Sequence, residues 1–471
     1  MRRKLITNFF YQASYQVLLI ILPIITIPIV SNALGPEGIG KFNFVNSIAA
    51  YFILVAGLGM ANYGVREISI VKNNKDLLSK KFWELAFFNL IFSSITFILY
   101  ILVMGFFGDY LYFMITSITI FSCIFDITWF FAGIEDFKKI TIRNFVIKII
   151  GFLLVVILIK NQDDLILYFI ISSLSVLFSQ LSLWISIKKH VYFVKVSIRD
   201  SLSHLKSALD FFLAKVAITI YQNTTKTILG LLTTMSVVGI YSNAYSIVMM
   251  SANIINAMNT IMIPRMSNMY SQNDEDGMVR LLQRTIHLQI FFTIPITFGI
   301  ILTSSKLVPW FFGNEFLMVA PVLKFLSPVV IFQSFQMAVA SQYLIPKKDM
   351  KEYNFSVISG AVVTIITTII LVPFLSIYGA VIGLNMGYIF VSYLRLKVLL
   401  KETTFHFNLK EIFSFLLSAI SMWVITDAIT QNMNVGIFTT IFQVVLGTVI
   451  YFILTFLFKS NPLIVFLKKN D

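Results

Sequence analysis

The sequence predicts an all-α polytopic membrane protein with about 14 transmembrane helices and both termini in the cytoplasm. Hydrophobic residues make up 58% of the 471-residue chain, and charged residues only 12%. Apolar stretches recur along the whole chain, each long enough to match the roughly 20 helical residues that cross a bilayer core. Short basic segments separate these stretches. Little sequence remains for a soluble domain, so we expect transport across a membrane.

The predicted spans follow one another with short connections. Three connections, near 35–41, 233–237 and 375–378, contain or adjoin Gly and Pro, which favour tight reversals. The spans are predicted at 8–33, 42–64, 80–106, 112–134, 141–160, 164–187, 207–232, 237–263, 283–303, 317–344, 352–374, 378–398, 411–430 and 435–458.

The distribution of basic residues predicts the orientation. With the N-terminus inside, 30 of the 36 Lys and Arg fall on the cytoplasmic side, four fall outside, and Lys215 and Lys226 lie within a span. This bias predicts that both termini are cytoplasmic. The net charge of +14 is spread over many loops, so we read it as a topology signal and expect no nucleic-acid partner. The N-terminal apolar run is predicted to be an uncleaved first span.

Cysteine and histidine usage argues against a metal centre. The chain has one cysteine, Cys123, and four histidines that lack ligand spacing. We therefore expect no metal site. We also expect no cofactor, and no enzymatic activity because the apolar spans leave little soluble protein to carry an enzyme.

Two halves of the sequence resemble each other. A shift of 199 residues aligns Gly40–Ile48 with Gly239–Ile247 and Arg66 with Arg265. Both segments begin the second span of a six-span block, which predicts parallel repeats with a substrate path between them. We predict an N-lobe at 1–200 (helices 1–6), a C-lobe at 201–400 (helices 7–12) and a C-terminal helix pair at 401–471 (helices 13–14).

Polar residues inside the spans are the candidate site. Lys215, Thr219, Gln222 and Lys226 are four, three and four residues apart, so they share one helical face. Charges are costly in the bilayer, so this stripe predicts a substrate or translocation cavity. The alternative is that both lysines snorkel to the interface. Asn253 and Asn256 form part of a second stripe, which fits the same cavity or the polar contacts that hold helices together.

An acidic residue inside a span has its own interpretation. Asp126 is a candidate for ion coupling, by a proton or a sodium ion, and the alternative is a simple ion pair with a lysine. Prolines at positions 23 and 28 are predicted to bend the first span, which could act as a hinge.

Several motifs resemble the Wzx-type polysaccharide flippases of the multidrug/oligosaccharidyl-lipid/polysaccharide exporter superfamily. They are LGPEGIG at 34–40, YGVREI at 63–68, DITWFFAGIE at 126–135, and the pair Arg143 and Asn144. The resemblance covers nearly the whole chain in topology, but its specific motifs lie in the first 145 residues. Gln is common in the family pattern where this chain has Ala132.

The resemblance implies a two-lobed helical fold that works by alternating access. The implied substrate is an undecaprenyl-pyrophosphate-linked oligosaccharide repeat unit, moved from the cytoplasmic to the outer leaflet of the bacterial inner membrane. The resemblance thus implies a role in O-antigen, capsule or other surface polysaccharide biosynthesis, with polysaccharide polymerase machinery as an expected partner. Lys215 and Lys226 would supply a cationic cavity. Arg66 and Arg265 would form a cytoplasmic gate or bind phosphate, unless they are topology charges only. We expect a monomer.

Two other functions remain open at this point. A multidrug-type exporter of small molecules would share the architecture, but it should have an acidic cavity that collects cations. A membrane glycan polymerase or glycosyltransferase commonly needs a large extramembrane segment with catalytic carboxylates, whereas the longest loops here have about 20 residues.

Overall fold

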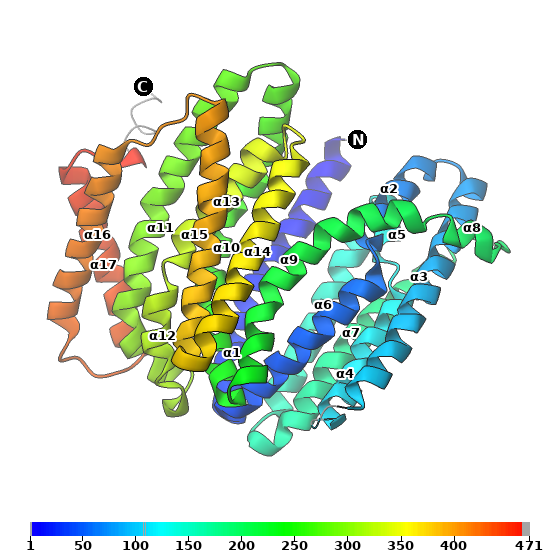
Figure 1. The fold of residues 1–471 in the computed structure, drawn as a ribbon, viewed down its shortest axis with the longest axis horizontal. Coiled ribbons are helices and arrows are strands. Elements are labelled where there is room, and N and C mark those ends of the chain that lie inside the picture. The colour runs from blue at the N-terminus through cyan, green and yellow to red at the C-terminus, as the bar shows by residue number, and fades with distance from the viewer. Residues whose placement is uncertain (1, 107, 109, 464–471) are drawn as a thin grey trace. The chain divides into compact units, whose positions relative to one another are not determined.

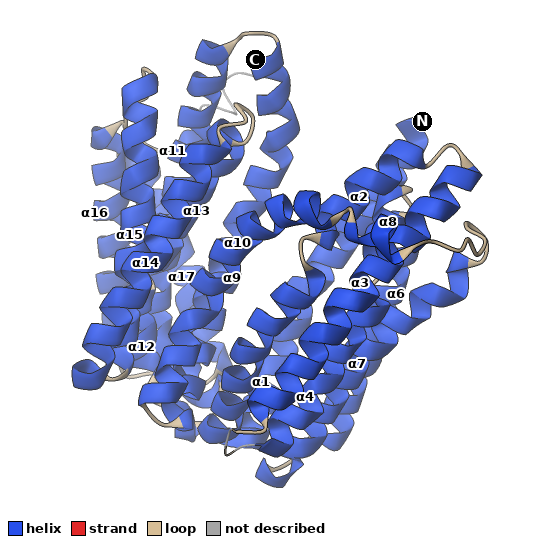
Figure 2. Cartoon of the chain, turned by 45° about the vertical axis from the view of Figure 1, so that its right-hand side comes forward, coloured by secondary structure: helices blue, strands red, loops and turns tan. Residues whose placement is uncertain are grey.

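The computed structural model describes residues 2–106, 108 and 110–463, and within them the chain forms helices and no β-strand. This confirms the predicted all-α fold. The chain divides into two compact units, 1–227 and 228–471. Figure 1 shows the long helices of each unit, and Figure 2 shows the loops and turns between them. The predicted lobe boundary at residue 200 stays a prediction.

Unit 1 contains the first helices of the chain. They are α1 (Arg2–Gly57), α2 (Met60–Val71), α3 (Lys75–Met104), α4 (Tyr110–Ser122), the short 3₁₀ turn η1 (Cys123–Phe125), α5 (Thr128–Gly133), α6 (Phe137–Leu158), η2 (Gln162–Asp164), α7 (Leu165–Ile187), α8 (Ile198–Leu202) and most of α9 (Leu205–Leu232).

Unit 2 contains the remaining helices. They are α10 (Met235–Ser271), α11 (Glu275–Phe311), η3 (Asn314–Phe316), α12 (Val319–Leu326), α13 (Val329–Val339), the π-helical turn η4 (Ala340–Leu344), α14 (Met350–Leu375), α15 (Ile377–Glu402), α16 (Leu409–Thr430) and α17 (Ile437–Leu457).

Eleven helices of the described chain are long and apolar enough to cross a membrane. The first of them, Ile21–Val71, contains Gly35, whose φ of 65° and ψ of 177° interrupt the helix at the reversal that the sequence predicts. Because a hydrocarbon layer leaves no water to bind backbone groups, such helices define a multi-pass membrane protein. The exact number of 14 spans and the cytoplasmic termini stay predictions.

Three predicted spans are not continuous helices. The span at 42–64 breaks between α1 and α2, where Gly59 has a φ of 78°. The span at 112–134 is divided into α4, η1 and α5, and the span at 317–344 into α12, α13 and η4. Hydropathy averaged over a whole span does not reveal such breaks, because it carries no information about backbone conformation.

Each unit has its own apolar core. Phe82 in unit 1 is fully buried and packs against Trp129 and Phe130, with ring centroids 5.8 and 5.1 Å away. In unit 2, Phe291 is fully buried against Phe415 and Tyr451. Such aromatic contacts fix the short helix α5 against α3 and bring the C-terminal helices onto α11.

Candidate functional site

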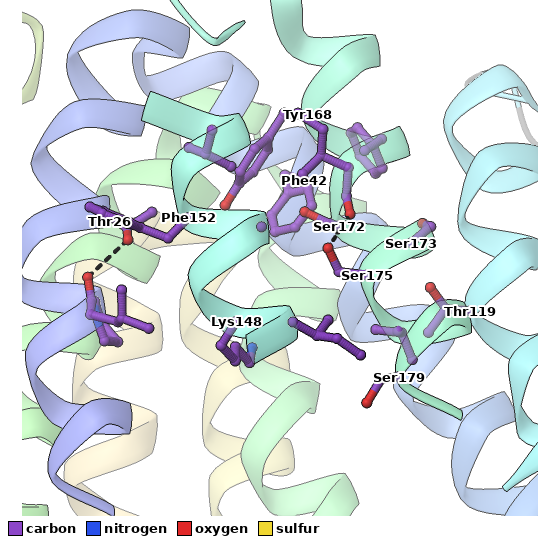
Figure 3. A pocket seen from close by; sticks show the side chains of 18 of the residues that line it. Thr26, Phe42, Thr119, Lys148, Phe152, Tyr168, Ser172, Ser173, Ser175 and Ser179 are labelled. Atoms are coloured by element: carbon purple, nitrogen blue, oxygen red, sulfur yellow. Dashed lines mark hydrogen bonds between the residues drawn. The ribbon is translucent and has the colours of Figure 1, made fainter. Parts of the chain in front are cut away.

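A cavity of about 550 Å³ lies within unit 1, among α1, α4, α6 and α7 (Figure 3). Its apolar wall includes the aromatic residues Phe42, Phe152 and Phe169. Its polar wall consists of hydroxyl, amide and amine side chains, namely Thr26, Asn46, Thr119, Asn144, Lys148, Tyr168, Ser172, Ser173, Ser175 and Ser179. A pocket that combines apolar and aromatic surface with several polar groups is typical of ligand sites.

Serines on α7 supply much of the polar wall. Ser172, Ser175 and Ser179 are three and four residues apart, which places them on one face of the helix. The Ser175 hydroxyl donates to the Ile171 carbonyl at 2.7 Å. A serine oxygen that donates its hydrogen to the backbone keeps its lone pairs, so Ser175 can still accept a hydrogen bond from a ligand.

Gly151 on α6 keeps the cavity open beside these serines. A Cβ atom added at Gly151 would lie 3.1 Å from Ser175 Oγ, so a larger side chain would extend into the space that the cavity occupies. Lys148, one helical turn before Gly151, is the one cationic side chain among the residues that line the cavity.

Arg143 holds two of the helices that form the cavity. Its Nη1 donates to the Ser179 carbonyl on α7 at 2.9 Å, while its Nε and Nη2 donate to Asn144 Oδ1 at 3.0 and 2.5 Å. Because Arg143 occupies the carbonyl oxygen of Asn144, the amide NH₂ of Asn144 is the group left to meet a ligand. The Arg143–Asn144 pair that the sequence singles out therefore contributes to this cavity.

The stripe predicted on α9 is not part of this cavity, but it contacts α1. Lys226 Nζ donates to Asn43 Oδ1 at 3.1 Å. Two hydroxyl contacts lie close by, between Thr227 and Ser47 at 2.9 Å and between Thr227 and Tyr51 at 3.1 Å. In this part of α9, polar side chains join two helices, a role that intramembrane polar groups often have.

The other three members of that stripe are more open. Lys215 and Gln222 are exposed, and Thr219 is half-buried. The Thr219 carbonyl accepts a hydrogen bond from Asn223 Nδ2 at 2.9 Å. Lys215 is thus the lysine of the stripe that is accessible to a ligand, and the role of the stripe in a substrate cavity stays a prediction.

Asn256 belongs to a buried network of amides in unit 2, whereas Asn253 is exposed. Asn256 Nδ2 donates to Gln333 Oε1 at 2.9 Å, and Asn259 Nδ2 donates to Asn256 Oδ1 at 3.2 Å. Asn259 Oδ1 in turn accepts from Gln289 and Gln342, at 2.7 and 2.8 Å. This network joins α10, α11, α13 and η4.

The predicted gate and coupling residues have different environments. Arg66 on α2 and Arg265 on α10 are both exposed at the surface of their own units. Asp126 lies at the break between η1 and α5, where its Oδ1 accepts from the Thr128 backbone N–H at 2.8 Å. That contact gives a partner to the first backbone N–H of the short helix α5, which has none within the helix. A gate role for either arginine and ion coupling by Asp126 stay predictions.

The cavity in unit 1 is not predicted by any pattern in the sequence. Its residues come from four helices that are far apart in the chain, and only the serine spacing on α7 gave a local signal. Serines three and four residues apart in an apolar span are also common where helices pack closely.

Fold and site together define a multi-pass helical membrane protein with a polar cavity among the apolar helices of its first unit. The family model described as polysaccharide biosynthesis protein matches residues 5–270, more than half of the chain. The chain belongs to this family. The resemblance to Wzx-type flippases of the multidrug/oligosaccharidyl-lipid/polysaccharide exporter superfamily is thereby confirmed.

Two related sequences illustrate the relationship. A protein of Escherichia coli (strain K12) named "Putative O-antigen transporter" is 22% identical over 384 residues, which cover 80% of this chain and 92% of the relative. The "Probable low-salt glycan biosynthesis flippase Agl15" of Haloferax volcanii is 23% identical over 236 residues, about half of each chain (49% of both).

Solved structures share the fold. The lipid II flippase MurJ in an inward closed conformation aligns with a TM-score of 0.73 at 15% identity, over 96% of this chain and 98% of MurJ. An inward-facing multidrug resistance transporter of the MATE family aligns with a TM-score of 0.63 at 15% identity, over 82% of this chain and 96% of that structure.

Proposed function

We propose that this protein is a flippase for lipid-linked oligosaccharides. The substrate we propose is an undecaprenyl-pyrophosphate-linked repeat unit, which the protein moves from the cytoplasmic to the outer leaflet of a bacterial inner membrane by alternating access. The product would serve surface polysaccharide biosynthesis. Family membership and the names of the relatives support transport of a lipid-linked sugar.

The observation that carries the proposal is the mixed lining of the cavity in unit 1. Seven hydroxyl side chains and two amides match the many hydroxyl groups of a sugar. The ammonium group of Lys148 and the NH₂ group of Asn144 are donors that suit the anionic oxygens of a pyrophosphate. The aromatic and aliphatic wall suits the apolar faces of sugar rings or the first isoprene units of a lipid.

The lining of this cavity argues against the exporter alternative. A cavity that collects cationic drugs needs carboxylates, and the residues that line this one include no Asp or Glu. The fold is shared with a multidrug transporter, so the chemistry of the lining rather than the architecture separates the two functions.

Lipid analysis of a depletion strain tests the function. A leaflet-selective probe should find undecaprenyl-pyrophosphate glycans accumulating on the cytoplasmic leaflet, together with loss of a surface polymer. Repeat units that stay accessible at the outer face would refute the proposal, and an intact polymer would favour small-molecule export. Complementation with Lys148→Gln, which keeps a polar side chain but removes its charge, then tests the cavity. We expect it to restore flipping only in part.

A further inference from the structure

Three buried titratable side chains form a hydrogen-bonded series outside the cavity. They lie where α2, α3 and the start of α9 meet. The Tyr63 hydroxyl lies 2.6 Å from His204 Nδ1, and His204 Nε2 lies 3.2 Å from Glu84 Oε2. Tyr63 is only 3% exposed, and Glu84 and His204 are each 6% exposed. Figure 2 shows α2, α8 and α3 at the same end of unit 1.

The partners of His204 fix its hydrogen atoms when the ring is neutral. Glu84 Oε2 forms an ion pair with Lys81 Nζ, 2.7 Å away. An ionised carboxylate only accepts hydrogen bonds, so His204 Nε2 carries the hydrogen and Nδ1 is the acceptor. Tyr63 therefore donates to Nδ1, and both ring nitrogens of His204 have a partner.

The same atoms can also hold a protonated ring. A proton taken up from water would bind at Nδ1, which would then donate to the Tyr63 oxygen while Nε2 still donates to Glu84. The Tyr63 hydroxyl would then have to turn its hydrogen away from His204, towards another acceptor. Protonation thus reverses the hydrogen bond between Tyr63 and His204. It also puts a buried cation in the place of a neutral ring.

The surroundings of His204 disfavour its protonated form. Burial is the main cause that lowers the pKa of His204 below its ordinary value of 6.5, and the charge of Lys81 acts in the same direction. Glu84 on α3 and Glu67 on α2 raise the pKa, but they offset only part of the effect. The neutral ring therefore stabilises this arrangement, and acidification favours one in which His204 meets water.

His204 anchors α9, the helix that leads from unit 1 into unit 2. His204 directly precedes α9, and the boundary between the units falls within α9, between residues 227 and 228. The start of α9 is tightly fitted, because a Cβ at Gly59 would collide with the Ala208 carbonyl and lie 2.8 Å from Phe212 N. A change at His204 therefore acts on this connecting helix.

We propose that Tyr63, Glu84 and His204 form a proton-binding site that holds the start of α9 when His204 is neutral and releases it when His204 binds a proton. The ligand is a proton from the aqueous phase next to α2 and α8. The link from this site to transport rests on the proposed flippase function, whereas the proton site itself does not.

Thermal unfolding of the purified chain in lipid nanodiscs tests the site without transport. The wild-type Tm should fall by a few degrees between about pH 7.5 and about pH 5.5, on either side of the ordinary histidine pKa of about 6.5. His204→Gln should remove most of this fall. His406→Gln is the matched control, since His406 is exposed and hydrogen-bonded to Gln283 at 3.1 Å. An unchanged pH dependence in His204→Gln would overturn the proposal.

A second measurement covers the case in which His204→Gln does not fold. NMR of the chain labelled in its histidine rings gives the titration midpoint of each ring, and Tyr63→Phe assigns His204 because its signal alone should shift strongly. We expect the His204 midpoint below the ordinary histidine value of about 6.5. A His204 midpoint at or above that value excludes the site.

Flipping in proteoliposomes then tests the link to transport. The wild-type rate should rise as the pH falls through the range in which His204 titrates, and His204→Gln should lose this dependence. A wild type that flips at no pH, but whose Tm still depends on His204, would refute the flippase function and leave the proton site standing. A rate in His204→Gln that keeps the wild-type pH dependence would refute the link.

Discussion

Lys226 Nζ donates a hydrogen bond to Asn43 Oδ1 at 3.1 Å, so these two residues join α9 to α1 within unit 1. A lysine that the sequence predicts as a substrate contact therefore already contributes to helix packing. Lys215, on the same face of α9, is exposed. The two lysines of the predicted stripe should respond differently to mutation.

Charge reversal at Lys215 should reduce flipping and leave the fold intact. Lys215→Glu replaces attraction for a pyrophosphate by repulsion, and we expect the rate to fall at least about tenfold, equivalent to about 1.4 kcal/mol. Lys215→Arg keeps the charge and should retain part of the activity. Lys226→Glu should also lower the Tm, because Asn43 loses its donor. Flipping in proteoliposomes and thermal unfolding measure the two effects.

The control for these variants is Lys195→Glu, which reverses an exposed charge in the loop between α7 and α8. If Lys215→Glu flips at the wild-type rate, Lys215 does not contribute to substrate binding.

Filling the cavity of unit 1 should block transport. The Cβ of Gly151→Leu starts 3.1 Å from Ser175 Oγ, so the rest of the side chain must enter the cavity. We expect flipping to fall by about tenfold or more while the protein still folds, since a cost of about 1–3 kcal/mol for overpacking is usual. Gly299→Leu on α11 is the control, because nothing lies within 4 Å of a Cβ there. Equal flipping rates of both variants would mean that the cavity is not part of the transport path.

Arg143 should contribute to stability through the contact between α6 and α7. Arg143→Met removes its donors to the Ser179 carbonyl and to Asn144. A hydrogen bond to a charged group is worth about 1.5–3 kcal/mol, and we expect a loss of that size in the free energy of unfolding. Arg199→Met, in the exposed helix α8, should change little. If both variants unfold at the wild-type temperature, Arg143 does not hold these helices together.

Asn259 should be the central residue of the amide network in unit 2. Its Oδ1 accepts from Gln289 and Gln342, so Asn259→Ala leaves two buried donors unpaired, at a cost of about 1–3 kcal/mol each. Asn253→Ala on the same helix changes an exposed amide and should keep the wild-type Tm. Reduced flipping by Asn253→Ala at an unchanged Tm would support its predicted place in the substrate cavity. A normal Tm in Asn259→Ala would mean that other groups satisfy the glutamines.

Asn256, Lys226 and Asp126 show how far the sequence could predict the site. Their position inside apolar spans singled them out, because polar groups there need partners. Their actual partners, Gln333, Asn43 and the Thr128 backbone, come from packing and from a helix break. The cavity around Lys148 and Ser175 escaped prediction, since its residues converge from four helices.

Local hydropathy is enough to predict that this chain is a helical membrane protein, and roughly where most helices lie. The cost of burying each residue in lipid is local, so a run of apolar residues is enough to predict a helix. Where helices break, which faces meet and where the cavity lies depend instead on packing between segments that are far apart in the chain. Lipid tails are as apolar as leucine, so the buried and lipid-facing sides of a membrane helix look alike in sequence. Contacts between remote helices distinguish the two sides.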